Sequence, residues 1–322
     1  MIRVDNVTKF YGTHAAVKSL DFEISEGECV GFLGLNGAGK TTTLRLLSCL
    51  LLPTSGRIHI RDLDVEQNPH EIRKFIGFLP DTPPLYPEMS VRRFLEFAGQ
   101  LRSMSAADLR RRMPEVLQTC ALETVAELPI HTLSHGYKQR VGIAQAIVHE
   151  PDLLILDEPI QGLDPVQIVQ MREMIRRLRG KHTILLSTHI LFEIQQTCDR
   201  ILILNDGQIA AQGTEDELLR EHRADIIVDA ELRLPGCSDA EEVRRRILET
   251  FGESEMFSSF LVSSLTEERF AIEARADADL RAELASGLVS MGAGLLRLDR
   301  RASGLESMFV ELSGHDETRG ES

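Results

Sequence analysis

The chain has 322 residues, and its 36 Lys and Arg against 50 Asp and Glu give a formal net charge of −14. This charge offers no general attraction to nucleic acid or anionic lipid, so we expect no nucleic-acid partner. Apolar residues make up 43% and charged residues 27%, which is typical of a globular protein and excludes an intrinsically disordered chain. The most apolar stretch, residues 44–52, contains Arg45 and is about half as long as the roughly 20 residues of a membrane helix. We therefore expect a folded chain that does not cross a bilayer by itself.

The N-terminus and the cysteines indicate the compartment. Residues 1–7 alternate charged and apolar side chains and lack the apolar core of a signal peptide. The five cysteines are widely spaced and include no Cys-x-x-Cys pair, so the sequence predicts neither a disulfide framework nor a zinc site. We expect a cytoplasmic protein with reduced, buried thiols.

The first two thirds of the chain predict an α/β fold. Short, β-branched apolar runs at 28–33, 152–156 and 183–187 precede helical patterns that begin at Lys40, Pro165 and Ile190. Such alternation indicates βαβ units and a parallel sheet covered on both faces. Farther along, Ser90 and Ser105 are typical helix N-caps and β-branched residues become rare, so we expect an α-helical insertion at about 88–130.

The last third predicts a separate, small α+β domain. The pattern indicates strands at 228–234, 257–265, 269–276 and 295–299, with helices at 239–251 and 277–291. This β-α-β-β-α-β order is typical of a ferredoxin-like domain. A further apolar helix face follows, formed by Leu305, Met308, Phe309 and Leu312. The expected organisation is one domain at 1–219, a second at 220–313 and a polar, frayed tail at 314–322.

A glycine-rich segment predicts a phosphate-binding loop. Residues 34–41 match the pattern G-x-x-x-x-G-K-[ST] at every fixed position, after a predicted strand and at the start of a helix. Backbone N–H groups and the helix N-terminus then face one point and hold polyphosphate. Lys40 is expected to reach the β- and γ-phosphates of a nucleotide, and Thr41 to place its hydroxyl on Mg²⁺. The predicted binding residues are Asn36, Gly37, Ala38, Gly39, Lys40, Thr41 and Thr42.

Two carboxylates, Asp157 and Glu158, directly follow the apolar run at 153–156. The carboxyl end of a buried strand is where an open α/β sheet places its chemistry. Asp157 fits Mg²⁺ binding from outside the directly bound ligands, and Glu158 fits the general base that orients and deprotonates an attacking water. Alone, an acid pair after a strand is more often a helix N-cap, but next to a phosphate loop it predicts a hydrolytic site.

With these motifs in place, residues 1–215 resemble the ATP-binding subunit of an ABC transporter. The family's landmarks occur in its order: Tyr11 in residues 9–12, the phosphate loop, residues 78–81 at the Q-loop, 133–140 at the signature, Asp157 and Glu158, 162–164 at the D-loop, and 187–189 at the switch. The interval between Lys40 and Asp157 is too short for the long coiled coil of chromosome-maintenance relatives. The expected fold is an ABC-type P-loop NTPase with an α-helical insertion, followed by the ferredoxin-like domain.

The resemblance implies that two chains form a head-to-tail dimer around two ATP molecules. Ser134 and Gly136 of one chain would meet the γ-phosphate held by the other. Tyr11 would stack on adenine, and His189 would hydrogen-bond the γ-phosphate and the attacking water. The catalytic residues would be Glu158, His189 and Lys40. For Tyr11, covering an edge strand is the structural alternative, and for His189 it is capping a helix.

Three residues depart from the family pattern. Asp81 stands where many members have a Gln that touches Mg²⁺ and the attacking water. We count Asp81 with Thr41 and Asp157 as Mg²⁺ ligands, acting through an intervening water, although it could instead cap the turn at 81–83. His135 replaces the first glycine of the usual signature and Tyr137 its glutamine, which bears on the coupling rate because the bulkier His135 would sit at the dimer seam.

The single nucleotide domain with a C-terminal extension resembles the exporter branch of the drug and gliding-motility efflux type, in which the permease is a separate chain. This implies a protein held at the cytoplasmic face of the membrane through an integral membrane permease. The alternative is a soluble ABC-type ATPase of translation or DNA repair, although those usually carry two nucleotide domains or a long coiled coil. The C-terminal domain fits a regulatory or dimer-supporting role and a plain structural cap equally well.

Overall fold

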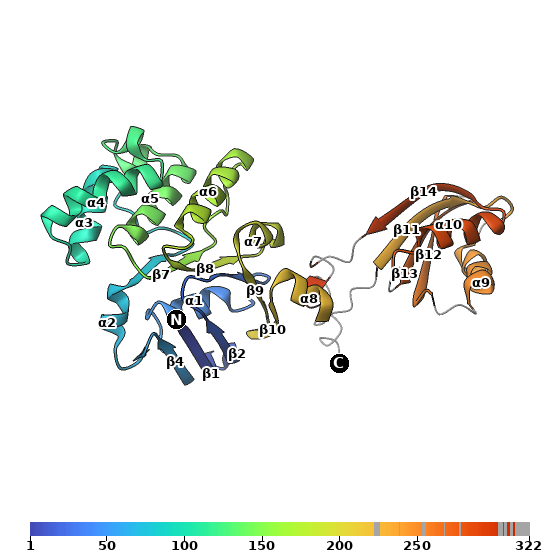
Figure 1. The fold of residues 1–322 in the computed structure, drawn as a ribbon, viewed down its shortest axis with the longest axis horizontal. Helices are drawn as coiled ribbons and strands as arrows, with labels where there is room; N and C mark the ends of the chain where they lie inside the picture. The colour runs from blue at the N-terminus through green and yellow to red at the C-terminus, as the bar shows by residue number, and fades with distance from the viewer. Residues whose placement is uncertain are drawn as a thin grey trace. The chain divides into compact units, whose positions relative to one another are not determined.

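The computed structural model describes residues 1–221, 226–237, 239–252, 256–266, 268–276 and 278–301, together with Leu305, Met308, Phe309 and Leu312. The chain forms two compact units, one of residues Met1–Glu215 and one that starts at Asp216 (Figure 1). In the described part of the chain, no helix is both long and apolar enough to span a membrane. The tail expected at 314–322 lies outside the described residues.

The first unit is built on a six-stranded sheet with the order β10-β9-β3-β8-β7-β6. Its strands are β3 (Cys29–Leu33), β6 (Ile76–Leu79), β7 (Leu153–Asp157), β8 (Thr183–Thr188), β9 (Arg200–Asn205) and β10 (Gln208–Gly213). Strands β3, β7 and β8 are buried along their whole length, as their continuous apolar sequences predict. Strand β10 is antiparallel to β9, whereas the other pairs are parallel, because a tight turn at 206–207 joins β9 to β10.

A second, antiparallel sheet belongs to the same unit and was not predicted from the sequence. Its order is β2-β1-β4-β5, with β1 (Ile2–Tyr11), β2 (His14–Ile24), β4 (Ser55–Ile60) and β5 (Leu63–Asp64). Side chains such as Val4 and Ile58 pack with Leu44 of α1 (Lys40–Leu47) and Phe32 of β3 in one apolar core. The helix that follows the phosphate loop is therefore held between the two sheets.

Helices cover the central sheet and form the predicted insertion (Figure 1). Besides α1 they are α2 (Pro69–Lys74), α5 (His135–Ile147), α6 (Pro165–Leu178) and α7 (Leu191–Thr197). Helix α8 (Glu215–Glu221) begins at the last residue of the first unit. The insertion contains α3 (Val91–Leu101), α4 (Ala106–Thr119) and two 3₁₀ turns, Glu123–Val125 and Ile130–Thr132. The predicted caps are confirmed, because Ser90 accepts from the N–H of Arg93 and Ser105 from that of Asp108.

The C-terminal unit has the predicted β-α-β-β-α-β order. It consists of β11 (Ile226–Arg233), α9 (Ala240–Phe251), β12 (Ser259–Thr266), β13 (Arg269–Ala276), α10 (Arg281–Ser290) and β14 (Gly294–Arg301). The strands form an antiparallel sheet in the order β12-β13-β11-β14, the arrangement of a ferredoxin-like fold. Helix α10 begins later than the predicted position 277, because Asp279 binds both the N–H and the guanidinium of Arg281 just before the helix. Leu305 and Met308 of the predicted apolar face are buried.

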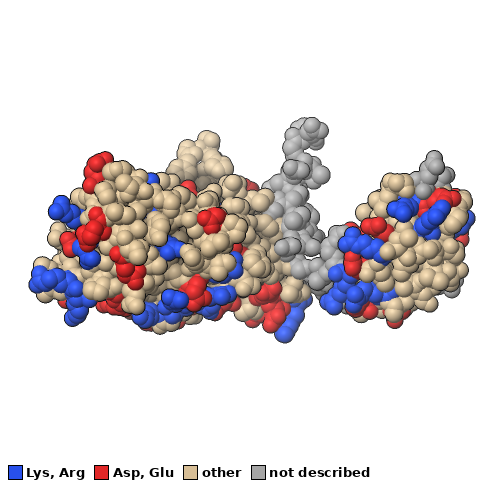
Figure 2. Space-filling view, turned by 90° about the horizontal axis from the view of Figure 1, so that it is seen from above, with Lys and Arg blue, Asp and Glu red and all other residues tan. Residues whose placement is uncertain are grey.

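Acidic and basic side chains are interspersed on the surfaces seen in Figure 2. Several of them pair, for example Lys74 with Glu71 in the first unit and Arg275 with Glu273 in the second. Each exposed pair contributes little to stability, about 0–1 kcal/mol, so packing in the cores described above holds the fold.

Candidate active site

The phosphate loop joins β3 to α1 and depends on glycine at its last turn. Gly39 caps α1 with φ +99°, a conformation that strongly favours glycine, and its carbonyl accepts the N–H of Thr43 at 2.9 Å. A Cβ at Gly39 would lie 2.6 Å from the carbonyl oxygen of Ala16 on β2. The loop can therefore lie close to β2 only because residue 39 has no side chain.

The loop opens onto a hollow of about 370 Å³. The predicted residues that line it are Asn36, Gly37, Gly39, Lys40, Thr41, Thr42, Asp81 and Glu158. His14, Ala16, Leu35 and Gln161 complete the lining and were not predicted. The hollow lies at the carboxyl ends of β3 and β7, where an open α/β sheet binds its ligand.

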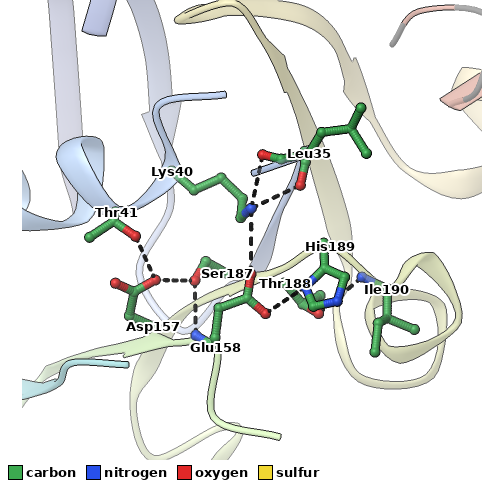
Figure 3. A network of polar contacts seen from close by, with 10 residues as sticks. Leu35, Lys40, Thr41, Asp157, Glu158, Ser187, Thr188, His189 and Ile190 are labelled. Carbon is green, nitrogen blue, oxygen red and sulfur yellow. Dashed lines mark hydrogen bonds and ion pairs between the residues drawn. The ribbon is translucent and has the colours of Figure 1, made fainter. Parts of the chain in front are cut away.

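Glu158 lies between the two other predicted catalytic residues (Figure 3). Its Oε1 is 3.4 Å from Lys40 Nζ, and its Oε2 is 3.1 Å from His189 Nδ1. Lys40 Nζ also donates to the carbonyl oxygens of Gly34 at 2.8 Å and Leu35 at 3.3 Å. Lys40 and Glu158 are both buried, so their charges interact through a medium that screens them less than water.

The backbone of Glu158 adopts a conformation that is uncommon for a residue with a side chain, with φ +47°. The backbone nitrogen of Glu158 donates to Ser187 Oγ at 3.0 Å and lies 3.2 Å from the carbonyl oxygen of Ser187. Such a conformation costs about 1–3 kcal/mol and persists only where neighbouring groups hold it. Here the bonds to Ser187 hold the backbone that directs the carboxylate toward Lys40.

Asp157 and Thr41 supply oxygen ligands of the kind that Mg²⁺ prefers. Thr41 Oγ1 lies 3.4 Å from Asp157 Oδ1, and Ser187 Oγ donates to the same oxygen at 2.6 Å. In the described part of the chain, no three His, Cys, Asp or Glu side chains are grouped to hold a metal by themselves. Mg²⁺ needs no such group, because it usually takes one or two carboxylates and completes its shell with phosphate and water. The hydroxyl and the carboxylate therefore fit Mg²⁺ bound together with a nucleotide.

Known proteins of similar sequence and fold identify the family. The ABC transporter family profile matches residues 17–161. Nod factor export ATP-binding protein I of Cupriavidus metallidurans is 33% identical over 324 residues, which cover 98% of this chain and 98% of that protein. The chain belongs to the ABC transporter ATP-binding proteins.

Two further relatives extend the comparison. Linearmycin resistance ATP-binding protein LnrL of Bacillus subtilis is 30% identical over 318 residues, 98% of each chain. A dimeric ATP-binding cassette, solved in a post-hydrolysis state with ADP and Pi, is 28% identical with a TM-score of 0.62, covering 66% of this chain and 98% of that chain. ABC ATP-binding domains hydrolyse ATP, and this chain is an ATPase with the predicted P-loop NTPase fold.

Some predicted residues of this ABC ATPase lie outside the hollow. Tyr11 is 46% exposed and pairs across β1 and β2 with His14, which does line the hollow. Ser134 caps α5 by accepting from the N–H of Tyr137, and a Cβ at Gly136 would lie 2.5 Å from the side-chain oxygen of Gln167 on α6. Ala38, a residue of the loop itself, is buried. Ser134 is thus exposed and Gly136 is buried next to α6, and neither residue lines the hollow of its own chain.

Asp81, at the Q-loop position of this ABC ATPase, is exposed at the edge of the hollow. Its carbonyl oxygen lies 3.5 Å from the amide nitrogen of Gln139, which is buried on α5. Gly142 of the same helix packs against Leu79 and Pro83. Helix α5 is therefore in direct contact with the segment that leads from β6 into the helical insertion.

Proposed function

We propose that this ABC ATPase supplies the energy for an exporter whose membrane permease is a separate chain. Relatives that match over their full length carry the names Nod factor export and linearmycin resistance ATP-binding protein, which supports an export role. The transport complex would hold the ATPase at the cytoplasmic face of the membrane. ATP binding and hydrolysis would then drive the permease, which selects the substrate.

The proposed reaction is in-line attack of water on the γ-phosphate of ATP. The observation that carries this proposal is the position of the Glu158 carboxylate, which lines the hollow and lies between Lys40 and His189. Lys40 and the N–H groups of the phosphate loop stabilise charge on the phosphate oxygens. Glu158 accepts the proton of the attacking water, and His189 holds that water and the γ-phosphate.

Thr41 and Asp157 would hold Mg²⁺ against the phosphates, with Asp81 acting at the edge through a water. When bound, Mg²⁺ supplies positive charge to the β- and γ-phosphate oxygens. Ser187 keeps the Asp157 carboxylate in its orientation through the 2.6 Å hydrogen bond. This division leaves the Glu158 carboxylate available for the water.

We further propose that two chains enclose two ATP molecules head to tail. Ser134 and Gly136 of one chain would complete the site of the other, and Tyr11 would stack on the adenine. Their position outside the hollow of their own chain supports this role, as does the dimeric form of a related cassette.

Co-expression tests the export role. The chain is produced with and without a candidate permease chain, and membranes are separated from the remaining lysate. We expect the ATPase in the membrane fraction only when the permease is present. Co-purification with ribosomes or DNA, with no permease-dependent membrane fraction, would contradict the proposal and favour the translation or repair alternative.

A further inference from the structure

The first turn of α5 contacts the turn that links β7 to α6 within the same chain. This 158–164 turn contains Glu158, Gln161 and Gly162. His135, the first residue of α5, places its Nε2 3.1 Å from the carbonyl oxygen of Gln161. A Cβ at Gly162, which has φ +72°, would lie 3.4 Å from the same nitrogen, so the imidazole ring lies directly against the turn.

Elementary chemistry identifies the hydrogen-bond donor in the contact between His135 and Gln161. A carbonyl oxygen only accepts, so Nε2 of His135 carries the proton and donates it to Gln161. A glycine at position 135 has no side chain and could not make this bond. The hydrogen bond is therefore a property of this chain that depends on its departure from the usual signature.

The 158–164 turn is also part of the chain's own ATP site. Gln161 lines the hollow, and its N–H donates to the carbonyl oxygen of Glu158 at 3.2 Å. On the other side of His135, the adjacent Ser134 caps α5 and is exposed. The His135 side chain thus connects Gln161, which lines the chain's own hollow, to Ser134. Under the proposed function, Ser134 reaches the ATP of the partner chain.

We propose that His135 is a positioning residue that couples the two ATP sites of the dimer. This inference rests on the proposed head-to-tail dimer. ATP in the hollow contacts the wall formed by Glu158 and Gln161 and restrains the 158–164 turn. The His135 hydrogen bond passes that restraint to Ser134, so that a filled site presents Ser134 in the orientation that closes on the partner's γ-phosphate. By linkage, closure on the partner's ATP strengthens binding in the first site by the same factor.

Three variants of the full-length chain separate this role from general folding. His135→Leu keeps bulk and removes the donor, whereas His135→Gln keeps an N–H donor on a side chain of similar reach. His131→Leu is the matched control, because His131 Nδ1 also lies 3.1 Å from a backbone carbonyl, that of Pro87, which is not in the 158–164 turn. All three are made in Glu158→Gln, so that slow turnover leaves time for ATP to drive dimerisation, and a thermal melt checks the folding of each.

The measurement is the magnesium-ATP concentration at half-dimerisation, by light scattering, together with ATP affinity of the dilute, monomeric chain. For His135→Leu we expect a two- to tenfold higher half-dimerisation concentration, about the effect of one net hydrogen bond, with monomer affinity unchanged. His135→Gln restores the original value, and His131→Leu does not change it. An unchanged value in His135→Leu, no rescue by His135→Gln, or an equal effect in His131→Leu would overturn the inference while leaving the dimer intact. Failure of the Glu158→Gln parent to dimerise with ATP would instead overturn the proposed dimer, and the inference with it.

Discussion

Ser187 Oγ donates a hydrogen bond to Asp157 Oδ1 at 2.6 Å and accepts one from the backbone N–H of Glu158 at 3.0 Å. One buried hydroxyl on β8 therefore orients both acids that end β7. The parallel register that places Asp157 opposite Ser187 brings these groups together. Ser187 has no proposed role in the chemistry itself. Through its two hydrogen bonds it fixes Asp157, proposed to bind Mg²⁺, relative to Glu158, proposed as the general base.

Replacing Ser187 with Ala should weaken both functions of the site. Asp157 loses a donor that orients it, so we expect Mg²⁺ affinity and ATP turnover to fall by about 10- to 100-fold. The N–H of Glu158 also loses its hydrogen bond to Ser187 Oγ, the shorter of its two contacts with Ser187, and this loss destabilises the fold by about 1 kcal/mol. Turnover against Mg²⁺ concentration, with a denaturant titration, measures both effects. Ser48→Ala is the control, since Ser48 is also buried and donates only to Arg45 in α1. Equal turnover in the two variants would contradict the assignment.

Replacing two glycines of the phosphate loop in turn should distinguish the cost of backbone strain from the cost of steric overlap. Gly37 has φ +88° and a Cβ there would meet only open space, whereas a Cβ at Gly39 would overlap the carbonyl of Ala16. Gly37→Ala should therefore cost about 1–2 kcal/mol of stability, the strain of the left-handed conformation alone. Gly39→Ala should cost clearly more, because the backbone of β2 must also move. Equal shifts in thermal unfolding without nucleotide would contradict this account of the loop.

The local motifs of the site could be predicted from the sequence, whereas contacts between distant segments could not. Lys40, Thr41, Asp157 and Glu158 occur in two contiguous patterns whose chemistry is specific. The roles of Ser187 and Gln161 depend on strand register and on a turn that reaches back into the hollow. Ser187 was included in the switch landmark at 187–189, but its contact with the two acids becomes visible only once β7 and β8 are paired.

The antiparallel sheet of the first unit was missed for a similar reason. Residues 1–7 do alternate and indicated one short strand, but beyond Val4 strand β1 pairs with β2 through register shifts, so the alternation does not continue along the strand. By contrast, β13 was predicted with its observed bounds, because Phe270, Ile272 and Ala274 alternate regularly and are buried. Regular alternation on one buried face is what makes a strand predictable.

Lys40→Ala should abolish ATP binding. Lys40 is the buried cation of the loop, and its loss also leaves the Glu158 carboxylate without its nearest positive partner. Lys74→Ala, which removes an exposed lysine paired with Glu71, should bind ATP normally. Calorimetric titration with magnesium-ATP measures both variants. ATP affinity retained in Lys40→Ala would count against the phosphate loop as the nucleotide site.

The stability of the first unit should depend on pH through His149. Its Nε2 donates to the carbonyl oxygen of Ile76 at 3.1 Å, and burial, assisted by the charge of Arg102, lowers its pKa from 6.5 to about 4. The unfolded chain therefore binds more protons between pH 6.5 and pH 4. Stability is full above pH 6.5 and falls as the pH drops to 4, by up to about 3 kcal/mol. His149→Gln should flatten this dependence in thermal unfolding, and an unchanged slope would contradict the buried, neutral histidine.

ATP turnover by full-length Glu158→Gln, measured beside its ATP binding, tests the proposed chemistry most directly. Gln keeps the shape of the side chain but cannot accept the proton of the attacking water. We expect normal ATP binding and a loss of about 10²- to 10⁴-fold in turnover, with Glu71→Gln, an exposed control, unaffected. Near-normal turnover in Glu158→Gln would contradict Glu158 as the general base.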